Sequence, residues 1–182
     1  YHAEAIWIPF MTYDEIGKPG DDFYPVGTEP LPGGIKQKFR SVDQPTRDPS
    51  NSAYGLRLST LKDGWDISGF YYGSRDASPT FFRRFEADTT PTLIFEPEHK
   101  RIHQFVGTLA KDFSNFLIRA EAIYTLDRRY LVNDLTDSDG VVKQDTLDYA
   151  IGLQHATMGG TTLNFQFFQR WYTNHDSDTL FD

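Results

Sequence analysis

Six charged residues occupy the polar positions of segments in which apolar and polar side chains alternate. They are Arg57, Asp66, Arg119, Glu121, Asp148 and Arg170. Guanidinium and carboxylate groups of mixed sign along strands are suited to lining an aqueous passage, where their field selects among solutes. They are equally suited to pairing with one another across strands that surround a filled interior. Both interpretations keep them away from hydrocarbon, because an arginine at the bilayer midplane costs roughly 2–4 kcal/mol.

Other candidate chemistry is weaker. The segment 135–140, LTDSDG, resembles a calcium loop with Gly140 as its turn glycine, but Leu135 and Thr146 stand where an EF-hand needs carboxylates. The sequence contains no GxSxG nucleophile elbow. The histidines show neither HxxxH nor HxH spacing; they are His2, His99, His103, His155 and His175. We therefore expect no metal site, no cofactor and no enzymatic activity.

Composition excludes several classes of protein. The 182 residues suffice for one domain with a sizeable core. A net charge of −8 with no basic run argues against a nucleic-acid partner, which would require clustered Lys and Arg. The chain has no cysteine and no apolar run long enough for a membrane-spanning helix. An aromatic content of 15 % favours β structure.

The strands that must position these residues are visible as period-2 alternation. In 115–126, NFLIRAEAIYTL, one set of alternate positions is apolar from Phe116 to Leu126, and the other carries Arg119 and Glu121. No segment shows a convincing helical stripe. Seven strands are predicted, at 1–9, 52–62, 65–74, 100–110, 115–126, 145–155 and 161–173.

The connections between these strands alternate between long and short. The short ones are 62–64, 111–114 and 157–160, and the long ones are 10–51, 75–99 and 127–144. We expect the connection at 10–51, which is rich in Pro and Gly, to be irregular and exposed, and we interpret FFRRFEAD at 81–88 as an ordinary surface loop. A 40-residue loop is unusual in a compact soluble domain. Outer-membrane barrels, in contrast, have short turns at one end and long loops at the other.

Aromatic residues lie near the ends of the predicted strands, where the interface between a membrane and water would be. They are Trp7, Tyr54, Trp65, Tyr71, Tyr124, Tyr149 and Trp171. Such rings also pack soluble cores, but the pattern of connections favours the membrane. We predict an all-β fold, an antiparallel up-and-down meander that is part of a transmembrane β-barrel with its apolar face in lipid.

Three blocks of the sequence resemble the DUF1302 family of bacterial outer-membrane proteins. They are AEAIWIPFMTYDEIGKPGDDFYP, YGLRLSTLKDGWDISGFYYGSRDASPTF and FEPEHKRIHQFVGTLAKDFSNFLIRAEAIYTLDRRY. The resemblance implies a Gram-negative outer-membrane location, contact with membrane lipid, and a porin-like role in transport. It also implies a periplasmic lipid-carrier-like protein and an inner-membrane transporter as partners. The family supplies no catalytic motif.

An odd number of strands does not fit a closed bacterial barrel, which has an even number. We therefore expect residues 1–182 to form a single β-barrel segment of about seven strands within a larger barrel. The expected function is a passage or docking component for export or uptake of a hydrophobic or amphiphilic compound. The alternative is a soluble β-sandwich or a lipocalin-like binding module, in which one face of the sheet packs against a core or a ligand cavity.

Overall fold

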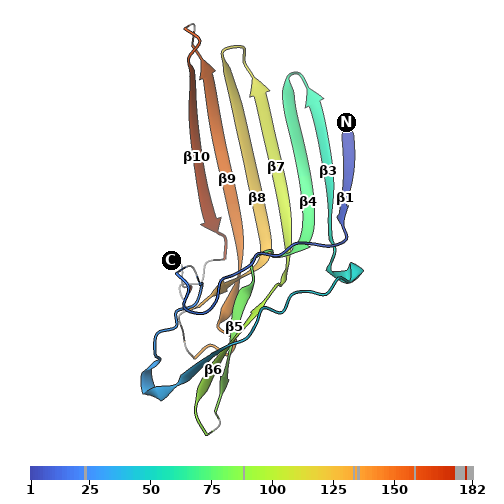
Figure 1. Cartoon of the computed structure of the whole chain (residues 1–182). Helices are drawn as coiled ribbons and strands as arrows, with labels where there is room; N and C mark the ends of the chain where they lie inside the picture. Colours follow the sequence, from blue (N-terminus) through green and yellow to red (C-terminus); the bar gives the residue numbers. More distant parts are fainter. Residues whose placement is uncertain are drawn as a thin grey trace.

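The computed structural model of the chain describes residues 1–22, 24–87, 89–132, 134, 136–157, 159–174 and 179. The described part contains ten β-strands and two single-turn 3-10 helices, η1 (Pro32–Gly34) and η2 (Pro49–Asn51) (Figure 1). The prediction of an all-β protein is therefore confirmed. No helix in the described residues has the length and apolar character needed to cross a membrane.

Seven long strands form one antiparallel sheet in the order β1-β3-β4-β7-β8-β9-β10. Their bounds are β1 (His2–Ile8), β3 (Ala53–Lys62), β4 (Trp65–Arg75), β7 (Arg101–Asp112), β8 (Phe116–Leu131), β9 (Val141–Ala156) and β10 (Thr162–Tyr172). They correspond to the seven predicted strands, and their antiparallel up-and-down order is confirmed. Among the described residues β1 and β10 each pair along one edge only, so the sheet is open.

The two ends of this sheet differ in how the strands are connected. Tight turns join β3 to β4, β7 to β8 and β9 to β10 at one end, the short-turn end, and all longer segments lie at the other, the long-connection end (Figure 1). In the β3–β4 turn Asp63 and Gly64 both have positive φ, 51° and 78°. This is the backbone that a two-residue hairpin requires and that an Asp-Gly pair adopts readily.

A second sheet of three strands lies beyond the long-connection end (Figure 1). It consists of β2 (Lys36–Phe39), β6 (Thr92–Glu98) and β5 (Thr80–Glu86), with β2 parallel and β5 antiparallel to β6. The prediction that 10–51 is irregular holds for most of that segment, in which β2 is the one strand of more than a single bridge among the described residues. The prediction of a surface loop at 81–88 was wrong, since most of that segment is β5, and the long connection predicted at 75–99 contains both β5 and β6. These strands are short, and the pair β2–β6 joins segments far apart in sequence, so local alternation gives little sign of it.

The connection at 127–144 is also shorter than predicted, because β8 continues to Leu131 and β9 begins at Val141. A β-bulge separates the pair Thr125–Thr146 from the pair Arg128–Gln144, and Asp127 in the bulge has a φ of 62°. The extra residue shifts the alternation of β8 by one position. The period-2 pattern therefore breaks at the bulge although the strand continues.

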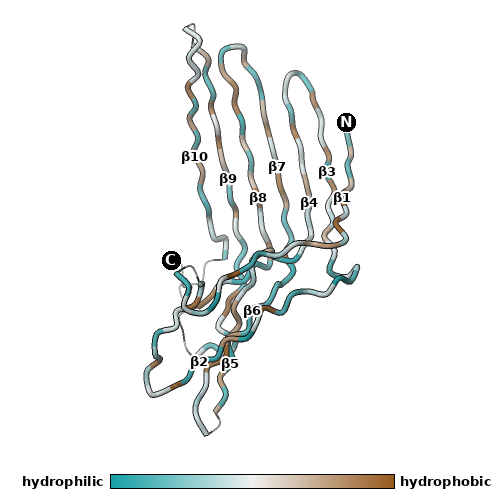
Figure 2. The backbone as a smooth tube through the Cα atoms, in the orientation of Figure 1, coloured by the Kyte–Doolittle hydropathy of each residue, from teal (hydrophilic) through white to brown (hydrophobic). Residues whose placement is uncertain are grey.

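The hydrophobic core belongs to the second sheet. Phe81, Leu93 and Phe95 form a buried cluster, and the rings of Phe39 and Phe95 stack with centroids 5.1 Å apart. The segment before β2 covers this cluster with partly buried apolar side chains, those of Ile16, Tyr24, Val26, Leu31 and Ile35. In the seven-stranded sheet apolar and polar residues instead alternate along each strand (Figure 2). Many of its large apolar side chains remain exposed, among them Leu58, Phe165 and Phe167.

One arginine joins the second sheet to the end of the first. The Arg83 backbone N–H of β5 donates to the Asp139 carbonyl at 2.8 Å, and its Nη1 donates to the Val132 carbonyl at 3.2 Å. Gly140, with a φ of 71°, lies against the Arg83 side chain, where a Cβ would come within 2.4 Å of its Cγ. The absence of a side chain at Gly140 therefore makes room for this contact.

Candidate functional site

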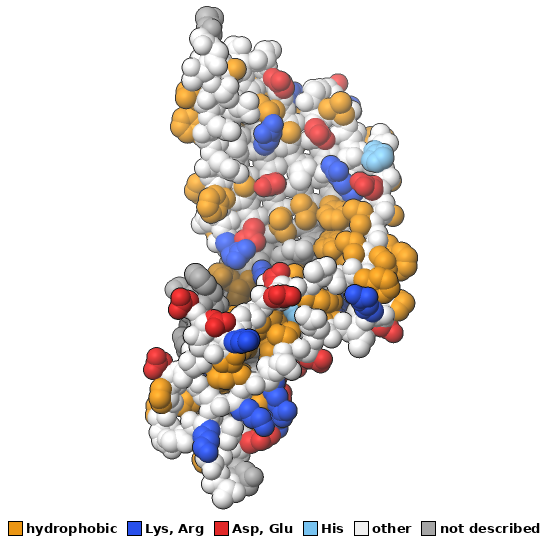
Figure 3. All heavy atoms as spheres, in the orientation of Figure 1, with side chains coloured by type: hydrophobic (Ala, Val, Ile, Leu, Met, Phe, Trp, Pro, Cys, Tyr) orange, Lys and Arg blue, Asp and Glu red, His pale blue; other side chains and the backbone are white. Residues whose placement is uncertain are grey.

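The six charged residues singled out from the sequence share one face of the seven-stranded sheet, here called the polar face. Directly opposed residues of an antiparallel pair project to the same side, and successive residues project to opposite sides. Arg57 opposes Phe70, Asp66 opposes Ala110, and Ala110 opposes Arg119. Glu121 opposes Ala150, and Asp148 opposes Arg170. The structure thus places all six on a single surface, over which acidic and basic side chains are scattered (Figure 3).

Two ion pairs lie at opposite ends of one row across the polar face. Arg170 Nε donates to Asp148 Oδ1 at 2.5 Å and Nη2 donates to Oδ2 at 3.0 Å, a bidentate arrangement. At the other edge Arg57 Nη1 lies 4.0 Å from Glu4 Oε2. Pairing between neighbouring strands, one of the two roles considered for these residues, therefore holds for Arg57, Asp148 and Arg170.

The other three charged side chains have no such partner. Asp66, Arg119 and Glu121 make no ion pair or side-chain hydrogen bond with any residue that the structure describes, and all three are exposed. They line a hollow of about 260 Å³ in the polar face. The hollow exists because small residues occupy its floor, namely Ala110, Ala150 and Gly152. These three charges are available to solvent or to a ligand.

Four uncharged residues, which were not among the predicted site residues, lie on the same face. Gln154 and Asn164 oppose each other, Gln166 opposes Gly152, and Phe168 opposes Ala150. The three amides line the hollow, and Phe168 shares an adjoining hollow with Glu121. Their positions follow from the same alternation, so listing every polar-position residue, and not only the charged ones, would have identified them.

The opposite face of the sheet, here called the apolar face, carries all seven aromatic residues assigned to a membrane interface. Trp7 opposes Tyr54, Tyr71 opposes Leu56, and Trp171 opposes Leu147. Tyr124 opposes Phe105 and Tyr149 opposes Ala122. Five of these six lie toward the long-connection end and Tyr149 lies near the middle of the sheet, opposite Ala122. Trp65 lies at the short-turn end, where Lys111 Nζ is 4.6 Å from the centre of its ring.

Between the row of Trp65 and the row of Trp7 and Tyr54 the apolar face contains no Asp, Glu, Lys or Arg among the described residues. Lys62 and Lys111 lie level with Trp65, and His103 lies level with Tyr54. Along β8 the outward residues are Phe116, Ile118, Ala120, Ala122, Tyr124 and Leu126. Several large side chains of the neighbouring strands are half or more exposed, including Ile151 at 50 %, Phe165 at 64 % and Phe167 at 56 %. No described part of the chain covers this face as a core would.

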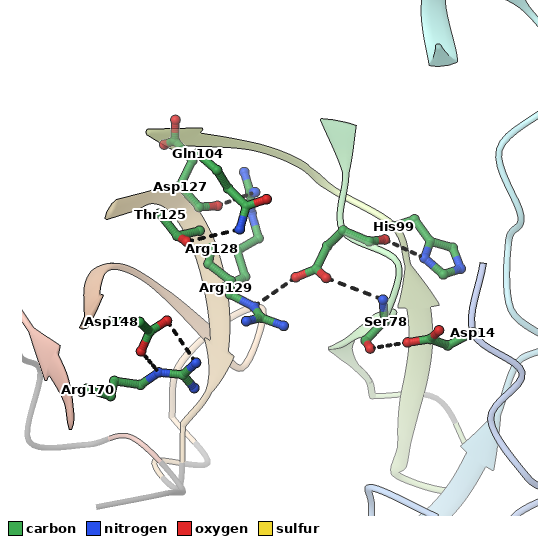
Figure 4. Close-up of polar contacts among 11 residues, drawn as sticks. Asp14, Ser78, His99, Gln104, Thr125, Asp127, Arg128, Arg129, Asp148 and Arg170 are labelled. Carbon is green, nitrogen blue, oxygen red and sulfur yellow. Dashed lines mark hydrogen bonds and ion pairs between the residues drawn. The ribbon is translucent and has the colours of Figure 1, made fainter. Parts of the chain in front are cut away.

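A polar clamp joins the seven-stranded sheet to the segments at its long-connection end (Figure 4). The buried carboxylate of Asp76 accepts hydrogen bonds from Arg128 Nε at 2.9 Å and from the Ser78 backbone N–H at 3.3 Å. His99 Nδ1 donates to the Asp76 carbonyl at 2.9 Å, and Ser78 Oγ donates to Asp14 Oδ2 at 2.5 Å. Sequence analysis missed this clamp, because its members are far apart in the chain.

The carboxylates of the acidic loop at 134–140 accept hydrogen bonds from N–H groups of the same loop. Asp137 Oδ1 accepts from the Gly140 backbone N–H at 2.6 Å, and Asp134 Oδ1 accepts from the Thr136 backbone N–H at 2.8 Å. This bond and that from the Thr136 hydroxyl lower the pKa of Asp134. The described residues contain no group of three or more His, Asp or Glu that could hold a metal ion. Leu135 and His175 lie outside the described residues.

The residues of the polar face include charged, amide and aromatic side chains, which can form hydrogen bonds and ion pairs with a solute. No serine hydroxyl among the described residues is hydrogen-bonded to a histidine ring, which is the pairing that an activated nucleophile requires. Comparison with protein-family models and with curated proteins finds no match to this chain. The functional argument therefore depends on the geometry of the two faces.

Proposed function

We propose that the seven-stranded sheet is part of the wall of a bacterial outer-membrane β-barrel, with its apolar face against lipid and its polar face lining an aqueous passage. One observation carries the proposal: between the row of Trp65 and the row of Trp7 and Tyr54 the outward band has no charged residue, and Lys62 and Lys111 lie at its boundary, level with Trp65. From Ile118 to Leu126, the β8 residues level with these two rows, the band extends about 27 Å along β8, or about 21 Å once the usual strand tilt is allowed for. The apolar band of such barrels is about 25 Å tall.

The alternative, a soluble β-sandwich or lipocalin-like module, has less support. In a sandwich the apolar face of one sheet packs against a second sheet about 10 Å away. Here the only buried apolar cluster among the described residues is that of the small sheet, built around Phe81 and Phe95. Contact with acyl chains accounts for exposed residues such as Phe165 and Phe167 without requiring a second layer.

The directions of the edge strands bear on how such a wall closes. Six successive antiparallel pairings make β1 and β10 run in the same direction. Pairing β1 directly with β10 would therefore create a parallel pair in an otherwise antiparallel sheet. An odd number of further antiparallel strands between these edges gives the even total of bacterial barrels and satisfies the open edges.

We further propose that the passage serves export or uptake of a hydrophobic or amphiphilic compound. Support comes from an apolar strip on the polar face, where Phe70 and Tyr72 stack with centroids 5.8 Å apart and Phe70 opposes Val106. The strip lies between the two ion pairs and continues to Ile123. Resemblance to the DUF1302 family supports the same role and suggests a periplasmic lipid-carrier-like protein and an inner-membrane transporter as partners.

Refolding of the purified chain with and without phosphatidylcholine vesicles tests the membrane assignment. We expect the chain to float with the vesicles in a density gradient and to aggregate when neither lipid nor detergent is present, because its apolar face is then exposed to water. A monodisperse chain that stays at the bottom of the gradient would favour the soluble alternative. Conductance across planar bilayers then tests whether the inserted chain forms an open passage.

A further inference from the structure

The hollow in the polar face has the composition of a binding site for a polyhydroxylated ligand. We propose that it binds a neutral saccharide, the polar part of the amphiphile that passes along this wall. The inference rests on the proposed function, because it takes the polar face to be the wall of an aqueous passage. It deepens that function by naming the chemical class of the head group.

Hydrogen-bonding capacity in the hollow is high and unused. Six side chains line it without a side-chain hydrogen bond to any other described residue: Asp66, Arg119, Glu121, Gln154, Asn164 and Gln166. Carboxylates accept, guanidinium donates, and each amide does both, so together they match hydroxyl groups, which also donate and accept. Other polar side chains on this face form hydrogen bonds with each other. Ser68 and Thr108 are joined by a hydrogen bond of 2.7 Å, and Gln104 donates one to Thr125 at 3.3 Å.

An aromatic ring stands beside these groups on the same face. Phe168 is 80 % exposed and projects from β10 two residues after Gln166. This exposure leaves the ring of Phe168 free to contact a ligand beside the hollow. The flat face of an aromatic ring packs well against the C–H face of a sugar, while planar polar side chains bind the hydroxyls at its rim.

The charges narrow the class of ligand further. Two carboxylates, Asp66 and Glu121, outnumber the single guanidinium of Arg119 in the hollow. A polyanion would be repelled by this excess of negative charge. A neutral saccharide meets no such penalty, and its hydroxyls can bind carboxylates and guanidinium alike. The charge of the hollow therefore argues against an anionic ligand, and the three amides beside the charges favour the hydroxyl groups of a neutral saccharide.

Saturation-transfer NMR on the vesicle-binding chain in detergent micelles tests this site with three neutral probes: maltohexaose, xylohexaose and cellotetraose. We expect at least one probe to receive saturation from the protein. Phe168→Ala and Gln166→Ala should each weaken its binding by about tenfold, the usual effect of losing one good contact. Ala150→Leu, which fills the floor of the hollow opposite Phe168, should abolish binding.

Phe167→Ala is the matched control, because Phe167 is the neighbour of Phe168 but projects from the apolar face. This variant should bind the saccharide as the unmodified chain does. Failure of all three probes, or binding that survives Phe168→Ala and Ala150→Leu, would overturn the inference. If the chain still floats with vesicles in that case, the membrane proposal stands. If the chain does not float, the membrane proposal itself has failed.

Discussion

Phe167 and Phe168 are neighbours in β10, yet they project from opposite faces of the seven-stranded sheet, Phe167 opposing Ile151 and Phe168 opposing Ala150. Both rings are exposed, at 56 % and 80 %. The two phenylalanines therefore have the same chemistry and the same place along the strand but different surroundings. In the proposed barrel, one contacts lipid and the other contacts the contents of the passage.

A charge introduced at these two positions should have opposite consequences. We expect Phe167→Arg to reduce the folded, vesicle-inserted fraction, because an arginine near the middle of the lipid-facing band costs about 2–4 kcal/mol. Phe168→Arg should insert nearly as well as the unmodified chain, since its guanidinium faces water. Urea titration of the chain in vesicles, followed by tryptophan fluorescence, measures both effects.

Ile151→Arg places the charge on the adjacent strand opposite Phe167. This variant should reduce the folded, vesicle-inserted fraction as Phe167→Arg does. Equal stability of the variants at 167 and 168 would contradict the assignment of the two faces to different media. A greater loss at 168 than at 167 would show that the polar face, and not the apolar face, tolerates a charge less well, and would overturn the assignment.

Sequence alternation predicted the seven-stranded sheet because each strand separates two unlike surroundings along its whole length. This is the condition under which period-2 patterns are strict. Arg119 and Glu121 on one side of β8, with Ile118 and Ala120 on the other, show the pattern clearly. The same alternation predicted correctly which six charged residues share the polar face.

The second sheet and the clamp could not be predicted in this way. The longer strands of the second sheet, β5 and β6, are only seven residues long, and β6 contains a proline, Pro97. Asp76 and Arg128 are 52 positions apart in sequence, and their contact arises only when the long connections fold back on the sheet. Nothing local in the sequence marks either residue as a partner of the other.

The Asp76–Arg128 pair is expected to stabilise the fold more than the pair at the sheet edge. The side chain of Asp76 is 12 % exposed and that of Arg128 is 32 % exposed, so removing the carboxylate charge leaves a largely desolvated cation without its partner. Asp76→Asn should lower the free energy of unfolding by about 1–3 kcal/mol in urea titration. Arg128→Gln should do the same, and the two losses should not add, because they report one interaction.

Glu4→Gln is the comparison for this pair, since Glu4 and Arg57 are about half exposed and 4.0 Å apart. An exposed pair contributes only about 0–1 kcal/mol, and salt screens it further. A loss for Glu4→Gln as large as that for Asp76→Asn would show that burial does not distinguish the two pairs.

Gly140 should be sensitive to substitution for two separate reasons. Its φ of 71° disfavours any other residue, and a Cβ there would meet the side chain of Arg83. We expect Gly140→Ala to cost about 1–3 kcal/mol and to increase hydrogen exchange at the Arg83 backbone amide, which bonds to Asp139. Gly64→Ala carries only the φ cost, since nothing lies within 4 Å of its added methyl group, and should leave exchange at Arg83 unchanged. Unchanged exchange in Gly140→Ala would mean that this glycine does not hold the two sheets together.

The acidic loop should respond to pH through Asp134, whose carboxylate accepts hydrogen bonds from the Thr136 N–H and hydroxyl. These bonds hold the pKa of Asp134 below its ordinary value of 3.8. A depressed pKa means that the ionised form stabilises the folded loop. This contribution is fully present above pH 3.8 and is lost as the pH falls through the lower folded value.

We therefore expect the Thr136 amide resonance to stay constant from neutral pH down to about pH 5 and to shift only in strong acid. Thr136→Ala removes the hydroxyl bond and should move the carboxyl titration of Asp134, followed by carbon NMR, toward its ordinary pKa. Thr136→Ser keeps both donors and should leave the titration where it was. An Asp134 titration at or above the ordinary pKa in the unmodified chain would mean that the Thr136 bonds do not hold the loop in solution.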